Sequence, residues 1–193
     1  MITTTHILLA MAALTKRKDW KRNATAFFGG LLPDLAVFLW YPYQKFVNGQ
    51  SDQEIWRVLY FEPPMQNLIA WFNSIPIFVT LAVIGYFTRS KLWGKLLLIL
   101  ALAALIHIAT DLPVHADDAY RHFWPISDWR FYSPVSYWDN SKHAFWVSKI
   151  DVALAVGSVA VLWQRFPTLW VKIALSVTLV FYAFVLFRSF GMG

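Results

Sequence analysis

The chain of 193 residues contains no cysteine, and only 15% of its residues are charged. Without cysteine there is no thiolate nucleophile, no iron–sulfur cluster and no cysteine-ligated zinc. A soluble domain carries about 25% charged residues, so the shortage of charge argues against a soluble globular protein. Apolar residues take its place, since 58% of the chain is hydrophobic and its mean hydropathy is +0.47. We therefore expect an integral membrane protein whose immediate partner is the lipid bilayer.

Aromatic and basic residues are the other notable features of the composition. Tryptophan, tyrosine and phenylalanine together form 18% of the chain, which is typical of proteins that meet a lipid–water interface. The formal net charge of +6 arises from 17 lysines and arginines that lie in small clusters between apolar stretches. Such clusters indicate membrane topology and not a nucleic-acid-binding surface, so we expect no nucleic-acid partner.

Long stretches with few charged residues predict five membrane spans, at residues 23–44, 63–88, 92–113, 143–164 and 166–187. Each reaches the length of about 20 residues that a transmembrane helix needs. A sixth apolar stretch, residues 2–14, is shorter, and the sequence leaves open whether it crosses the membrane or lies at its surface. The prediction is an all-α polytopic bundle of five or six membrane segments, forming one integral membrane domain over residues 1–193.

The charged residues also predict an orientation. Basic residues gather at 16–22, 89–95 and 165–172, whereas the loops at 45–65 and 114–142 hold most of the acidic residues. Because lysine and arginine accumulate in cytoplasmic loops, the acidic loops should face outward, as in a multi-pass protein of the cytoplasmic (inner) membrane. The second acidic loop is rich in aromatic residues and broken by proline, so we expect it to form an ordered outer cap.

A capping-box pattern lies in the first acidic loop. Ser51 is followed three residues later by Glu54, and Ile55, Val58 and Leu59 come next at helical spacing. This pattern predicts a short amphipathic helix on the outer membrane surface.

Polar residues inside apolar spans mark candidate functional positions, because a carboxylate near the bilayer centre costs about 2.5–3.5 kcal/mol. Asp34 follows Pro33, which interrupts its helix, and it is either functional or an N-cap for the resumed helix. His107 and Asp111 lie four residues apart on one helix face, where they can bind a metal or pair with each other. Together with His6, these groups would supply two imidazoles and two carboxylates for one divalent metal if their segments meet at one depth.

Three short motifs resemble the YdjM-like family of inner-membrane proteins, which are described as membrane-bound metal-dependent hydrolases. The motifs are Thr5-His6-Ile7-Leu8-Leu9, Leu32-Pro33-Asp34, and His107-x-x-x-Asp111 followed by Trp124-Pro125 and Arg130-Phe131. The resemblance covers residues 3–140 and implies a metal site formed by these histidines and aspartates. A middle motif of the family supplies further histidines, whereas the corresponding stretch here, residues 72–76, carries Asn73.

These observations predict a metal-dependent hydrolase that acts on an ester or phosphoester, of a lipid or a small molecule, at the outer membrane face. The cofactor would be a divalent metal, with zinc as first choice, because it activates water and polarises the scissile oxygen. His6, Asp34, His107 and Asp111 are the predicted ligands. The predicted catalytic residues are Asp117, Asp118 and Arg121, and the predicted substrate-binding residues are Asn73, His115, His122 and Arg130. Of these, the two histidines are also candidates to replace the missing family histidine.

The alternative is a non-enzymatic membrane protein. In that case the same buried histidines and aspartates form a structural polar network, or a path for ions or protons. A bound metal with an open coordination position favours the enzyme, and a fully hydrogen-bonded cluster favours the alternative.

Overall fold

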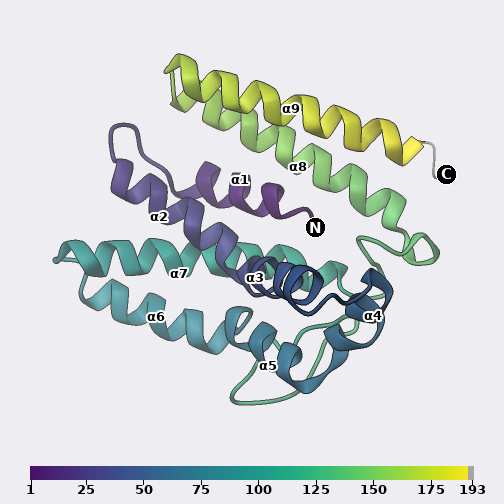
Figure 1. Cartoon of the computed structure of the whole chain (residues 1–193). Helices are drawn as coiled ribbons and strands as arrows, with labels where there is room; N and C mark the ends of the chain where they lie inside the picture. The colour runs from purple at the N-terminus through teal and green to yellow at the C-terminus, as the bar shows by residue number, and fades with distance from the viewer. Residues whose placement is uncertain (191–193) are drawn as a thin grey trace.

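The structure is a computed structural model that describes residues 1–190, and this part of the chain is all-helical (Figure 1). Five helical stretches are long and apolar enough to cross a membrane, as the sequence predicted. They are Trp20–Val47, Pro63–Phe87, Leu92–Val114, Ala144–Arg165 and Leu169–Phe187. The composition and these helices together define a membrane protein.

The first helix, α1 (Thr3–Leu14), answers the question that the sequence left open about the N-terminal stretch. Its 12 residues extend about 18 Å at roughly 1.5 Å per residue. The hydrocarbon core of a bilayer is about 30 Å thick, so α1 is too short to cross it alone. Figure 1 shows α1 in the middle of the bundle, with its N-terminal end inside the molecule.

Two of the five spans are interrupted helices. The first span consists of α2 (Trp20–Leu31), a 3₁₀ turn (Leu32–Asp34), α3 (Leu35–Pro42) and a π-helical turn (Tyr43–Val47). The second consists of α5 (Pro63–Phe72) and α6 (Ile75–Phe87). The predicted span at 63–88 is confirmed, but its helix breaks at Asn73 and Ser74, where the Ser74 side chain accepts a hydrogen bond from the Ile77 amide and starts α6.

The remaining spans are regular and end in the predicted loops. They are α7 (Leu92–Asp111), which continues into a 3₁₀ turn (Leu112–Val114), α8 (Ala144–Arg165) and α9 (Leu169–Phe190). The capping-box prediction is confirmed, because α4 (Asp52–Arg57) begins where the Ser51 hydroxyl accepts the Glu54 amide. A further 3₁₀ turn (Leu59–Phe61) follows α4, and another (Asn140–Lys142) precedes α8.

The helices form a layered bundle in which α1 is central. Figure 1 shows α8 and α9 on one side of α1, and α2, α7 and α6 on the other. Helix α1 contacts α2, α7 and α8. Small residues fill these contacts, as shown by the full burial of Ala10, Ala26, Ala103 and Ala155. Such residues let transmembrane helices approach closely.

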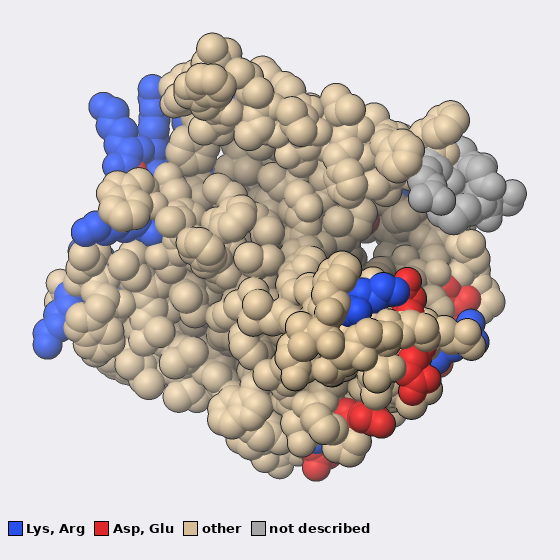
Figure 2. Space-filling view, in the orientation of Figure 1, with Lys and Arg blue, Asp and Glu red and all other residues tan. Residues whose placement is uncertain are grey.

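Charged side chains separate toward the two ends of the bundle. Figure 2 shows lysines and arginines at the end where Figure 1 places the α1–α2 and α6–α7 connections. The visible acidic side chains lie mostly at the opposite end, around α4 and the 115–143 loop. The fold thus brings the predicted inner loops to one end and the predicted outer loops to the other.

Because the chain lacks cysteine, single cysteines can test this topology. We expect cysteine at Gln53 or Ser127, both exposed at the acidic end, to react with a membrane-impermeant thiol reagent in intact cells. Cysteine at the exposed Ser90, at the basic end, should react only after the membrane is permeabilised. If only the Ser90→Cys variant were labelled in intact cells, the orientation would be the reverse of the one predicted.

Candidate metal centre

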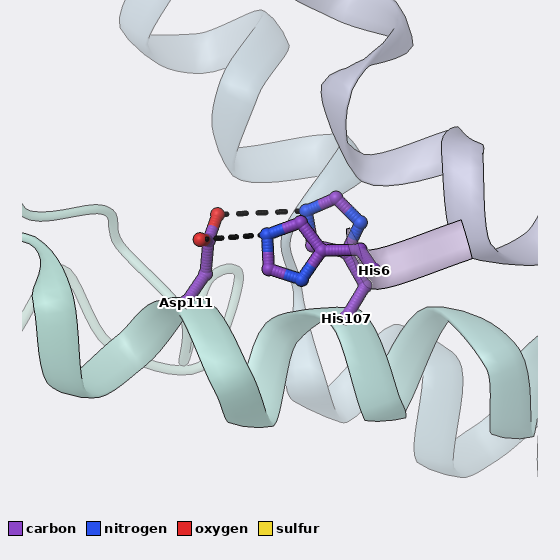
Figure 3. Close-up of side chains that lie close together, drawn as sticks. All are labelled: His6, His107 and Asp111. Carbon is purple, nitrogen blue, oxygen red and sulfur yellow. Dashed lines mark ion pairs between the residues drawn. The ribbon is translucent and has the colours of Figure 1, made fainter. Parts of the chain in front are cut away.

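Two helices bring a buried group of possible metal ligands together. His6 lies on the first turns of α1, and His107 and Asp111 lie one turn apart near the end of α7. One ligand atom from each side chain lies within 4.8 Å of the other two, and all three residues are buried. Figure 3 shows the two imidazoles facing the carboxylate, and their rings are stacked with centroids 3.7 Å apart. This group could hold a metal ion.

The distances within the site suit a tetrahedral metal. Asp111 Oδ1 lies 3.0 Å from His6 Nε2, and its Oδ2 lies 3.5 Å from His107 Nε2 and 3.2 Å from His115 Nε2. Asp34 Oδ1 lies 3.5 Å from His107 Nε2. Neighbouring ligands of a tetrahedral zinc ion, each about 2.0–2.2 Å from the metal, are separated by about 3.3–3.6 Å. Three of the four separations are thus within or close to this range, and the His6 contact is shorter.

The ring tautomers of two histidines are fixed by partners outside this group. His107 Nδ1 donates a hydrogen bond to the Gly30 carbonyl oxygen over 2.7 Å, and His115 Nδ1 donates to Asp118 Oδ2 over 2.9 Å. Carbonyl and carboxylate oxygens only accept hydrogen bonds, so the proton of each neutral ring resides on Nδ1. The Nε2 lone pairs then point toward the acidic group, which is the arrangement that metal-binding histidines use.

His6 is oriented in the same way by a hydroxyl group. Its Nδ1 lies 2.8 Å from Thr110 Oγ1, and this hydroxyl donates to the carbonyl oxygens of Ile106 and His107. Because the hydroxyl proton is used on the backbone, the oxygen accepts the proton of His6 Nδ1. The Nε2 atom of His6 then also presents a lone pair to Asp111.

The three Nε2 atoms are buried near carboxylates and yet form no hydrogen bond within the described residues. This is true of His6, His107 and His115, although each lies within 3.5 Å of an oxygen of Asp111. Buried polar atoms of folded proteins nearly always have a partner, and a bound ion can be that partner. A cation between the rings and the carboxylate would satisfy all of them.

The electrostatics at the mouth of the site favour a positive centre. His115 follows the last turn of the α7 span. Its burial alone would lower the pKa of its imidazole, but the carboxylates of Asp111 and Asp118 outweigh that effect and raise the pKa to about 9. Without a metal, these carboxylates favour a second proton on His115 Nε2, and a metal cation would replace that proton and be stabilised in the same way.

Asp34 lies beside the site, and its role as a helix cap is not supported. Its side chain makes no capping hydrogen bond to α3. Instead, Oδ2 accepts a hydrogen bond of 2.5 Å from the Thr3 hydroxyl, and Oδ1 faces His107. Asp34 therefore adjoins the three-residue group through His107, on the side of a cavity.

The cavity connects the polar group with the surface. It has a volume of about 890 Å³, and its polar lining includes Asp34, Asp111, His115 and Asp118. Aromatic side chains form much of the remaining wall, among them Tyr60, Tyr120 and Tyr137. Figure 2 shows a hollow where Figure 1 places the N-terminus, beside the acidic end of the bundle. Asp111 of the three-residue group is thus accessible to a molecule that enters this cavity, whereas the fully buried His6 and His107 do not line it.

The two predicted catalytic aspartates of the outer loop occupy different environments. Asp118 is buried, binds His115 and lines the cavity. Asp117 is exposed and forms an ion pair of 2.5 Å with Lys142. The structure therefore brings Asp118, and not Asp117, next to the candidate ligands.

Arg121, predicted to be catalytic, and Arg130, predicted to bind substrate, fasten the outer loop to α5. Arg121 pairs with Asp128 and donates to the carbonyl oxygen of Gln66 and the side chain of Asn67. Arg130 donates to the Gln66 side chain and to the Ala119 carbonyl oxygen. Hydrogen bonds within the protein therefore engage both terminal nitrogens of Arg121 and one terminal nitrogen of Arg130. This network is consistent with the expected ordered cap.

Asn73 and His122 lie together at the break in the second span. The Asn73 amide donates to the carbonyl oxygens of Pro33 and Ile69, and His122 Nδ1 donates to the Asn73 carbonyl oxygen over 3.0 Å. Burial lowers the pKa of His122, which keeps its ring neutral. These two residues tie the outer loop to the breaks of both interrupted spans, and neither is part of the three-residue group.

Adjacent glycines position the two histidine-bearing helices, a role that the sequence reading missed. A Cβ on Gly29 would lie 2.6 Å from Ala103 Cβ of α7, and one on Gly30 would lie 3.0 Å from Ala10 Cβ of α1. Only glycine lets α2 touch α1 and α7 so closely at these positions. The adjacent glycines in the sequence could have indicated this close helix contact, because small residues let transmembrane helices approach each other.

Comparison with known proteins adds no relative, since no protein-family model, curated protein or solved structure matches the chain. The resemblance to the YdjM-like family therefore stays a prediction.

The glycine contacts predict a clear difference between two substitutions. Gly29→Ala should destabilise the protein by about 1–3 kcal/mol, because the added methyl group overpacks the α2–α7 contact. Gly157→Ala in α8 is the control, since its Cβ would meet nothing within 4 Å and alanine favours a helix. Thermal unfolding of both variants in detergent measures the difference, and equal stability of the two variants would contradict the packing role.

Proposed function

We propose that the protein is a membrane-embedded metal-dependent hydrolase, with His6, His107 and Asp111 as the principal ligands and zinc as the metal. One observation carries the proposal. Three imidazoles have Nδ1 bound elsewhere and direct an unpartnered Nε2 toward the carboxylate of Asp111. Imidazole and carboxylate are common zinc ligands, so the donor set suits this metal. His115 and Asp34 are the further ligands that the geometry allows.

The residues around the ligands can support hydrolysis of an ester or phosphoester. A divalent metal at this site would activate water and polarise the scissile oxygen. Asp118 orients His115 through its Oδ2, while its Oδ1 has no hydrogen-bond partner among the described residues. Asp118 is therefore our candidate for the general base. Asp117 is less suitable, because its carboxylate is engaged by Lys142 at the surface.

A second candidate function is a structural polar network or a path for protons. It is favoured by the short contact of 3.0 Å between His6 and Asp111, which can pair directly if the imidazole is protonated on Nε2. The amino group of Met1, 2.8 Å from Asp111 Oδ1, also supplies positive charge. Such a cluster would be stable without metal, so metal content separates the two functions.

We predict that the protein purified in detergent retains about one divalent metal per chain, and that His107→Ala and Asp34→Asn each lose most of it. The first removes a ligand, and the second removes a negative charge while nearly preserving side-chain volume. His143→Asn is the matched control, because His143 is exposed, far along the chain, and has a positive φ of 67° that asparagine tolerates. Elemental analysis gives the metal content, and size-exclusion chromatography checks folding.

A metal-free wild-type protein, or variants that keep the wild-type content, would support the polar network instead.

The assignment of Asp118 predicts a separation between metal binding and activity. Asp118→Asn should keep the metal but lower the hydrolysis of a chromogenic ester or phosphodiester by about 100-fold or more, as expected for loss of a general base. Asp117→Asn should retain activity, because Asp117 is exposed and paired with Lys142. The opposite ranking of the two variants would exclude Asp118 as the base.

A further inference from the structure

One basic side chain lies in the cavity wall without a hydrogen-bond or ion-pair partner among the described residues. Arg57, the last residue of α4, is the only lysine or arginine among the residues that line the cavity. It forms no hydrogen bond or ion pair with the described residues, whereas Lys45 at the same end of the molecule pairs with Asp52 over 3.0 Å. The cavity therefore contains a guanidinium group that is free to bind an anion.

The cavity changes in character from its opening to its floor. Phe38, Trp56, Phe61 and Trp138 line it and are exposed on the protein surface, so they lie around the opening. Asp111 is only 2% exposed and forms part of the floor together with the other buried polar groups. A molecule that fills the cavity thus contacts an aromatic rim with one free cation, and it reaches the candidate metal ligands below.

This arrangement specifies a ligand with two chemical parts. An arginine guanidinium binds phosphate or carboxylate through charge-assisted hydrogen bonds. Exposed aromatic side chains at a membrane surface bind apolar chains and the interfacial part of lipids. Phe38 belongs to a membrane span, which places one side of the rim at lipid depth.

We propose that the cavity binds an anionic phospholipid, with its acidic headgroup at Arg57 and its apolar chains against the aromatic rim. This proposal rests on the proposed function for the hydrolytic role of the cavity floor, and it names the substrate class. Arg57 is better suited to bind an anion than Arg121 or Arg130, whose guanidinium groups form hydrogen bonds within the protein. A neutral or zwitterionic headgroup lacks the net charge that this rim selects.

Direct binding tests the proposal without relying on hydrolysis. The probes are dihexanoyl phosphatidylglycerol, dihexanoyl phosphatidylcholine and water-soluble glycerol phosphate, each titrated into detergent-solubilised protein by calorimetry. We expect phosphatidylglycerol to bind at least ten-fold more tightly than the other two probes. Arg57→Gln should weaken its binding by about ten-fold, in line with the loss of one charge-assisted hydrogen bond. Arg57→Lys should recover part of that loss.

Lys45→Gln is the matched control, because it removes one positive charge from the same end of the molecule outside the cavity lining. Equal losses in Lys45→Gln and Arg57→Gln would reduce the effect to general electrostatics and overturn the proposal. Unchanged binding in Arg57→Gln would overturn it as well, and equal binding of glycerol phosphate would exclude the lipid chains. If Arg57→Gln does not fold, Arg57→Met gives the same comparison.

Different results would contradict the hydrolase proposal and the phospholipid proposal. A protein that contains no metal but still binds phosphatidylglycerol through Arg57 would be a lipid-binding protein and not a hydrolase. A protein with metal but without headgroup preference would retain the hydrolase proposal and lose the assignment of its substrate.

Discussion

The buried carboxylate of Asp111 imposes the strongest physical demand on this structure. A charged group costs several kcal/mol to bury unless it is paired, and Asp111 lies at the end of an apolar membrane span. The Met1 amino group donates a hydrogen bond to its Oδ1 over 2.8 Å, and three imidazole nitrogens lie 3.0–3.5 Å from its oxygens without forming hydrogen bonds. The imidazoles leave room for a cation that they would share with the carboxylate. This demand supports the proposed metal binding more directly than any single sequence motif does.

The unusual features of the fold serve to assemble this group. Helix α1 is too short to cross a membrane, and its first turns instead carry His6 into the bundle beside α7. The glycine pair at 29 and 30 lets α2 touch both helices, and the carbonyl of Gly30 fixes the ring of His107. The outer loop then adds His115 and forms part of the cavity wall beside the group. Short, interrupted and closely packed helices are therefore parts of one arrangement.

The sequence predicted the spans and the helical part of the site, because hydropathy and the spacing of His107 and Asp111 depend on local structure alone. It could not distinguish the environments of neighbouring loop residues, since Asp117 and Asp118 differ only in where an irregular backbone directs them. The break at Asn73 was missed because uncharged residues surround it, and hydropathy does not register a single polar residue. Arg57 was not predicted as a binding residue, because the sequence does not show that it lines the cavity without a partner among the described residues.

The most direct test is to locate the metal within the protein. Anomalous diffraction at the zinc absorption edge, from crystals of the purified protein, measures the position of the ion independently of any activity. The account predicts one strong peak between α1 and α7, about 2.0–2.2 Å from Nε2 of His6 and His107 and from an oxygen of Asp111. Crystals without such a peak, in which these imidazoles form direct hydrogen bonds to the carboxylate, would contradict it.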